Sequence, residues 1–129
     1  MSKARAARKP NLGAVVTSAT VRFTRVPPRK ARIVADLLRG LTVEEAQEQL
    51  QLVHRPSAAP VISNLLKSAV ANARNGERAE GVDPEELIIG EIFVDGGPML
   101  KRYRPKAFGR ANIIRKRMSH ITIRLYREA

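Results

Sequence analysis

The sequence of 129 residues contains no cysteine and no tryptophan, and only two tyrosines and three phenylalanines. The absence of cysteine excludes disulfides, thiolate metal ligands and cysteine nucleophiles. An aromatic content of 4% leaves few rings on which the bases of a single-stranded nucleic acid could stack. No apolar run reaches the length of about 18 residues that crosses a bilayer, and the N-terminus lacks the apolar stretch of a signal peptide. We therefore expect neither a membrane span nor a signal peptide.

What the chain has in excess is positive charge, with 24 lysines and arginines against 12 acidic residues and a formal net charge of +12. Residues 1–39 contain ten basic residues and one acidic residue, residues 40–97 contain four and ten, and residues 98–129 contain ten and one. Two cationic segments on either side of an acidic one are typical of a protein that binds a polyanion with two surfaces and turns a third to water. A generic solvated basic surface is the alternative interpretation.

The length and a hydrophobic content of 43% indicate one folded domain. We assign it to residues 14–129, including a hairpin extension over about residues 99–118. The preceding residues 1–13 are basic and lack a periodic apolar pattern, so we interpret them as an N-terminal tail.

Three helices are predicted. The first covers residues 29–39, between Pro28 and Gly40, with an apolar face formed by Ile33, Val34, Leu37 and Leu38. The second begins at Thr42, whose hydroxyl can form a capping box with Glu45. The third extends from about residue 57 to Asn75, and its broad apolar arc predicts the central helix of the core.

Three strands are predicted at residues 15–23, 87–94 and 120–126. The second of these is almost continuously apolar, which is typical of a strand covered by helices on one side and paired on both edges. The third alternates apolar and polar residues. The predicted fold is therefore α+β, with three helices packed on a small antiparallel three-stranded sheet.

The residues between the last two strands predict a long protruding β-hairpin. From residue 96 to residue 119 they contain eight basic residues, no acidic residue and few apolar ones. Because an isolated two-stranded hairpin is marginally stable in water, another molecule must surround it. The charge indicates that this molecule is RNA or DNA.

Little in the sequence supports a catalytic or metal-binding function. The two histidines, His54 and His120, lie far apart in the sequence, and no carboxylate cluster has metal-ligand spacing. We therefore predict no enzyme, no catalytic residue, no metal site and no cofactor. A membrane-surface role is disfavoured because the cationic segments lack a bulky apolar face.

A sequence-specific DNA-binding protein is the main alternative. The short link of Gly40 and Leu41 between the first two predicted helices has the length of a helix-turn-helix connection. The second helix, however, carries three glutamates and no basic residue, so DNA phosphates would repel it.

Three segments of the chain contain extended motifs. Residues 29–40 read Arg-Lys-Ala-Arg-Ile-Val-Ala-Asp-Leu-Leu-Arg-Gly, and residues 67–73 read Lys-Ser-Ala-Val-Ala-Asn-Ala. Residues 92–98 read Ile-Phe-Val-Asp-Gly-Gly-Pro and are followed by Lys101-Arg102, Pro105, Gly109-Arg110-Ala111, Lys116-Arg117 and Ser119-His120-Ile121-Thr122. In order and spacing, over nearly the whole chain beyond the tail, these motifs resemble the bacterial large-subunit ribosomal protein L twenty-two family. The chain departs from the family pattern at Pro27, Gly96, Tyr103 and Arg104.

The resemblance implies a cytoplasmic structural protein of the large ribosomal subunit that binds ribosomal RNA, supports subunit assembly and lines the nascent-peptide exit tunnel with its hairpin. The implied partners are large-subunit ribosomal RNA, neighbouring large-subunit proteins and the nascent peptide at the hairpin tip, and we expect no homo-oligomer. The RNA-binding candidates are Lys3, Arg5, Arg8, Lys9, Arg22, Arg25, Arg29, Lys30, Arg32, Lys101, Arg102, Arg104, Lys106, Arg110, Arg115, Lys116, Arg117 and His120. The tunnel-lining candidates are Leu100, Lys101, Arg102, Tyr103, Arg104, Pro105, Lys106, Ala107, Gly109 and Arg110.

Overall fold

The computed structural model describes residues 12–76 and 83–128. Its main elements are, in chain order, β1 (Leu12–Thr24), α2 (Pro28–Leu38), α3 (Val43–Leu52), α4 (Ala59–Asn75), β2 (Ile88–Pro105) and β3 (Ala111–Glu128). Short 3-10 segments occupy Pro84–Glu86 and Ala107–Gly109. The three helices and the antiparallel three-stranded sheet confirm the predicted α+β fold. The four basic residues of the predicted tail, Lys3, Arg5, Arg8 and Lys9, lie outside the described residues.

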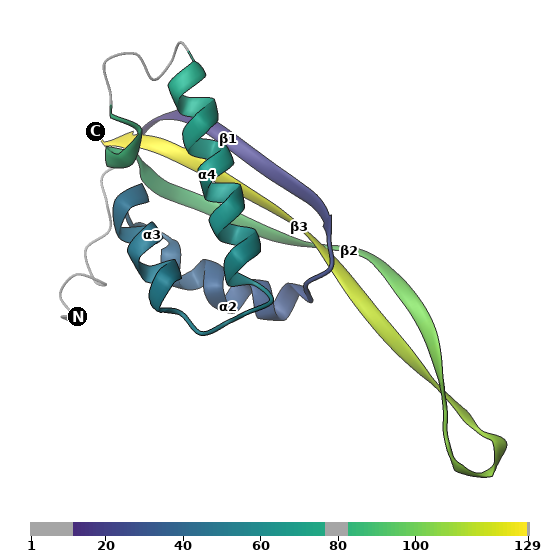
Figure 1. Ribbon diagram of the computed structural model, residues 1–129. Coiled ribbons are helices and arrows are strands. Elements are labelled where there is room, and N and C mark those ends of the chain that lie inside the picture. The colour runs from purple at the N-terminus through teal and green to yellow at the C-terminus, as the bar shows by residue number, and fades with distance from the viewer. Residues whose placement is uncertain (1–11, 77–82, 129) are drawn as a thin grey trace.

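The strand order in the sheet is β1-β3-β2, and both pairings are antiparallel. The helices pack against one face of the sheet, with α4 running along the strands and α2 beside β2 (Figure 1). The prediction that residues 87–94 pair on both edges holds only in part: β3 is the central strand and β2 lies at an edge of the sheet, and the outer edge of this segment is bonded to the backbone of residues 40–43 only at Leu87 and Ile89. Within the body, β3 pairs with β1 on one side and with β2 on the other.

Local signals set the helix boundaries. Pro28 stands at the start of α2, and Gly40, two residues beyond its end, adopts the left-handed conformation (φ 81°) that glycine tolerates. The predicted capping box is present: the Glu45 amide donates to the Thr42 hydroxyl at 3.3 Å, and the Thr42 amide donates to the Glu45 carboxylate at 3.4 Å. Pro60 lies in the first turn of α4. No helix in the described ranges is both long and apolar enough to cross a membrane.

The core lies between the helices and the covered face of the sheet. As predicted, α4 supplies much of it: Ile62, Leu65, Leu66, Ala69, Val70 and Ala73 are buried. The predicted apolar face of α2 is wrong in part, because Ile33 and Leu37 are 48% and 50% exposed. The buried face contains Ala31, Val34, Ala35 and Leu38, whose spacing follows the helical repeat. The two alanines allow α2 to approach the sheet closely.

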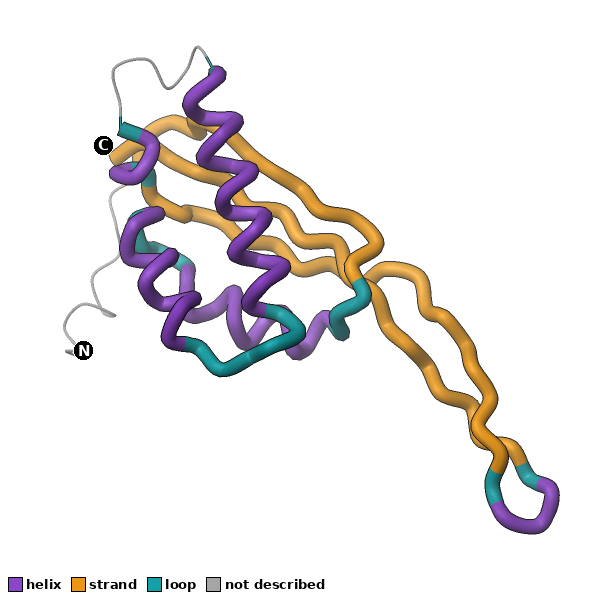
Figure 2. The backbone as a smooth tube through the Cα atoms, in the orientation of Figure 1, coloured by secondary structure: helices purple, strands orange, loops and turns teal. Residues whose placement is uncertain are grey.

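Beyond Gly96 the paired strands β2 and β3 leave the body as a two-stranded extension (Figure 2). The register shifts between Gly96 and Met99, and residues 99–105 then pair with residues 111–117. Among the described residues, neither a third strand nor a helix covers this part. We call residues 99–117 the arm, and the other described residues the body. Every side chain from residue 101 to residue 117 is exposed.

Candidate nucleic-acid interface

The arm carries a dense, uncompensated positive charge. Eight basic residues lie on it, and no acidic residue occurs between positions 98 and 127. No salt bridge in the described part of the chain involves an arm residue. The basic residues are Lys101, Arg102, Arg104, Lys106, Arg110, Arg115, Lys116 and Arg117.

The register divides six of these cations equally between the two faces of the ribbon. Cross-strand partners share a face, and successive residues alternate between faces. The pairing of Lys101 with Arg115 and of Met99 with Arg117 places three cations on one face. The pairs Leu100–Lys116, Arg102–Ile114 and Arg104–Asn112 place three on the other. A polyanion that binds all six therefore has to contact both faces of the arm.

The cationic side chains of the body near the arm form a second cluster, which we call the neck cluster. Arg22 and Arg25 are exposed at the end of β1, where Thr24 pairs with Ser119 just beyond the arm. Arg29 and Lys30 are exposed in the first turn of α2, a few residues further along the chain. The fold thus brings four predicted RNA-binding residues to the base of the arm.

His120 lies at the same place and has a defined orientation. Its Nδ1 accepts a hydrogen bond from the Phe23 amide at 3.1 Å, and the two rings pack edge to face with centroids 5.0 Å apart. Because Nδ1 is an acceptor, the neutral ring carries its proton on Nε2. That nitrogen can donate to a phosphate or a ribose hydroxyl. We include His120 in the neck cluster.

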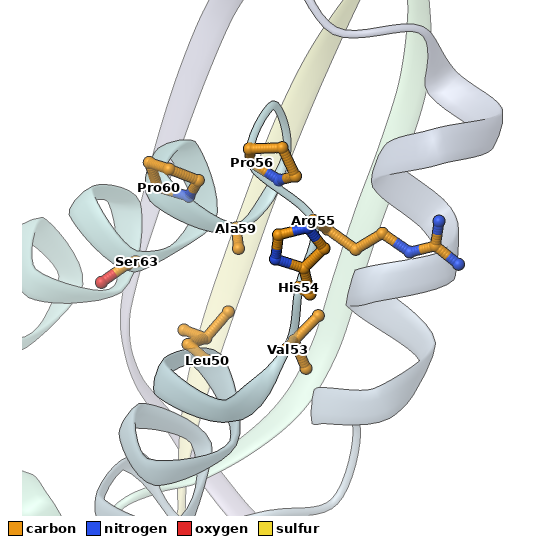
Figure 3. A pocket seen from close by; sticks show the side chains of 8 residues that line it. All are labelled: Leu50, Val53, His54, Arg55, Pro56, Ala59, Pro60 and Ser63. Carbon is orange, nitrogen blue, oxygen red and sulfur yellow. The ribbon is translucent and has the colours of Figure 1, made fainter.

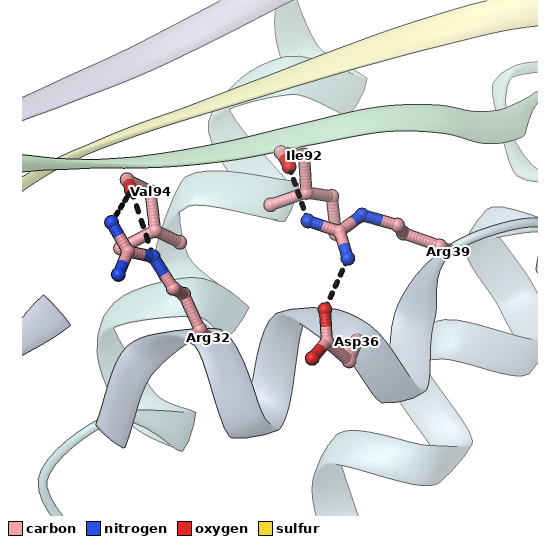
Figure 4. Close-up of polar contacts among 5 residues, drawn as sticks. All are labelled: Arg32, Asp36, Arg39, Ile92 and Val94. Atoms are coloured by element: carbon pink, nitrogen blue, oxygen red, sulfur yellow. Dashed lines mark hydrogen bonds and ion pairs between the residues drawn. The ribbon is translucent and has the colours of Figure 1, made fainter. Parts of the chain in front are cut away.

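Arg32 has a role in the fold that sequence reasoning missed. Its Nε and Nη2 donate to the Val94 carbonyl at 3.2 and 2.9 Å, and Nη2 of Arg39 donates to the Ile92 carbonyl at 2.9 Å (Figure 4). Arg39 is also paired with Asp36. Both arginines thus satisfy carbonyls on the outer edge of β2, an edge that would otherwise be open to another strand. Sequence gives no signal of this role, because helix and strand are far apart along the chain.

We predict that Arg32→Ala lowers the free energy of unfolding of the free chain by about 1 kcal/mol, because the Val94 carbonyl loses both donors. Arg29→Ala is the matched control, since Arg29 lies one turn earlier on α2 and its side chain makes no hydrogen bond within the described part of the chain. Urea unfolding of the two variants without RNA measures the difference. Equal stability of both variants would contradict a structural role for Arg32.

The charge on the uncovered face of the sheet is, in contrast, internally compensated. Arg124 donates to the Glu91 carboxylate at 3.0 Å and lies 5.3 Å from the centroid of the Phe93 ring. A hydrogen bond to the same carboxylate, together with desolvation, raises the pKa of Tyr126 above its usual value of 10.0. These groups bind one another, so this face offers less free positive charge than the arm.

The hollow between α3 and α4 does not have the chemistry of an active site. It has a volume of about 260 Å³, and Figure 3 shows Arg55 extending away from the other lining side chains. One imidazole and one hydroxyl face it, but no carboxylate orients the imidazole. Among the described residues, no cluster of histidines and carboxylates could hold a metal ion. The lining residues are Leu50, Val53, His54, Arg55, Pro56, Ala59, Pro60 and Ser63.

The chain is similar to one known protein family and to individual members of it. The family described as ribosomal protein L22p/L17e matches residues 19–126. The large ribosomal subunit protein uL22 of Rubrobacter xylanophilus is 50% identical over 107 residues, which are 83% of this chain and 81% of that protein. The protein of the same name from Desulforamulus reducens is 51% identical over 105 residues, covering 81% and 89% of the two chains.

Proposed function

Because the chain belongs to the ribosomal protein L22p/L17e family, we propose that it binds ribosomal RNA through its arm and neck cluster and lines the nascent-peptide exit tunnel. Proteins of this family are structural components of the ribosome. The chain is accordingly a structural protein of the large ribosomal subunit in the cytoplasm, and not an enzyme. Its proposed partners are large-subunit ribosomal RNA, neighbouring large-subunit proteins and the nascent peptide.

The observation that carries the RNA-binding proposal is the positive charge on both faces of the arm. Eight cations without a nearby acid repel one another, and the arm has no apolar layer to offset that repulsion. Phosphates on both sides would neutralise the charge and release the counterions that otherwise screen it. A folded RNA that encloses the arm supplies phosphates in this arrangement.

The neck cluster extends the proposed contact onto the body. Its arginines, its lysine and the Nε2 of His120 continue the positive surface from the base of the arm to the first turn of α2. The basic residues of the N-terminal tail are proposed to bind RNA as well. Arg32 contributes indirectly, because it secures the edge of the strand from which the arm grows.

The tunnel-lining proposal rests on the reach of the arm and on the family. At about 3.3 Å per residue, a strand of seven residues carries the tip roughly 23 Å from the body. The proposed wall residues lie on β2 from Leu100 to Pro105 and around the turn to Arg110. A body on the outside of the subunit could then place the turn beside a nascent peptide.

The proposal is tested by site-specific cross-linking in purified large subunits. A photoreactive phenylalanine derivative at Tyr103 retains every arm cation, and the same derivative at Glu48, on the acidic exposed side of α3, is the control. We expect cross-links to ribosomal RNA from position 103 and far fewer from position 48. Cross-links from position 103 to proteins alone would refute RNA binding by the arm. A derivative at Ala107 in translating ribosomes tests the tunnel, since it should cross-link to the nascent chain.

A further inference from the structure

The turn at the tip of the arm holds a phenylalanine in an unfavourable backbone conformation. Phe108 has φ 62° and ψ 34°, and Gly109 follows with φ 68°. Glycine adopts this left-handed region freely, whereas in a bulky residue the Cβ atom crowds the backbone. The Phe108 side chain is 99% exposed. The sequence prediction included the neighbours of Phe108 among the tunnel residues but not Phe108 itself.

A second phenylalanine with positive φ, Phe23, has contacts within the fold that Phe108 lacks. Phe23 is the only other non-glycine residue with positive φ in the described ranges. Its ring packs against His120, and its amide donates to the same imidazole. Phe108 makes no ring contact with any described residue. No described residue therefore offsets the strain and the exposed apolar surface of Phe108, and a partner molecule could do so.

The surroundings of Phe108 indicate the chemistry of that external partner. An open hollow of about 580 Å³ is lined by Phe108, Lys106, Arg110, Asn112 and Ala107. It presents one aromatic face, two cations and one amide, and no carboxylate. A nucleotide uses all of these groups: its base stacks on the ring, its phosphates pair with the cations, and the amide can bond to a base edge. An apolar peptide would use the ring but leave the cations unpaired.

We propose that Phe108 stacks on an unpaired nucleobase of large-subunit ribosomal RNA, with Lys106 and Arg110 on the adjacent phosphates. This inference rests on the proposed RNA binding and adds an anchor at the tip. Removal of a stacking ring typically weakens binding by about 5- to 150-fold.

The first test separates the ring from the backbone of the turn. Phe108→Gly removes the ring and favours the left-handed backbone, so the hairpin keeps its turn. We expect the full chain with this change to bind in vitro transcribed large-subunit RNA about 5- to 150-fold more weakly. Phe108→Tyr should retain parental affinity, and Ala107→Gly, which loosens the turn without removing a ring, should do the same. Parental affinity of Phe108→Gly would overturn the inference.

The second test observes stacking directly. The chain has no tryptophan, so Phe108→Trp introduces the only indole. Stacking on a base should quench its fluorescence strongly when large-subunit RNA binds, while heparin, a polyanion without bases, should not. Equal responses to RNA and heparin would show that the ring is not stacked. If the parent chain still binds RNA with a steep salt dependence, only the stacking inference fails; if it does not, the proposed function itself fails.

Discussion

Raising the monovalent salt concentration from about 50 to 200 mM should weaken the complex of this chain with large-subunit ribosomal RNA by about 10³–10⁵-fold, if roughly six to ten phosphates are contacted. The eight arm cations alone provide that number of contacts. Each neutralised phosphate releases counterions, and added salt opposes that release. A filter-binding or fluorescence titration at several salt concentrations measures the slope, and a loss of less than tenfold would contradict phosphate-dominated binding.

Two double variants assign this slope to the arm. Lys116→Ala with Arg117→Ala removes one cation from each face of the arm and should flatten the dependence of log affinity on log salt by about one to two units. Glu44→Gln with Glu48→Gln changes the net charge by the same magnitude in the opposite direction, on α3, and should leave the slope unchanged. These two glutamates are suitable because Glu45 is needed for the capping box. Slope changes of equal size and opposite sign in the two variants would mean that only the net charge matters.

Native-state hydrogen exchange of the free chain should show a large difference between arm and body. Amides of residues 102–113 should exchange at nearly the unfolded rate although they belong to a paired ladder, because a two-stranded ribbon without a covering layer opens readily. Amides of residues 65–70 in α4 should exchange at least about 10³-fold more slowly, since they open only with the whole body. Mass spectrometry of exchanged fragments resolves the two regions.

Addition of ribosomal RNA should then slow exchange in the arm directly, and exchange in α4 only as far as RNA binding stabilises the folded body against global unfolding. As a control, replacement of residues 102–113 by a short glycine-containing turn should leave the melting temperature of the free chain nearly unchanged, because those side chains are exposed and bury no core surface. Strong protection of the arm without RNA would mean that it has a partner within the chain, and the extended hairpin would be wrong for the free protein.

Elements whose causes are local could be predicted from the amino-acid sequence. Pro28 and Gly40 bracket α2, and Thr42 and Glu45 close the capping box of α3 a few residues apart. The apolar residues of α4 cover a wide arc of the helix, and this helix supplies much of the core, as predicted. The distribution of charge also required no structure, since it depends only on which residues occur in each segment.

Contacts between groups that lie far apart along the chain could not be predicted in this way, because they form only in the folded protein. Arg32 bonds to a carbonyl 62 positions away, and Phe23 bonds to a histidine 97 positions away. Packing and pairing between distant segments also place β3 rather than β2 at the centre of the sheet, and bury the alanines of α2 while leaving Ile33 half exposed. Such outcomes depend on the shape and the open hydrogen-bonding groups of the facing element, which no pattern within a single segment contains. The left-handed Phe108 follows the same rule, because hairpin closure imposes a conformation that the residue would not adopt by preference.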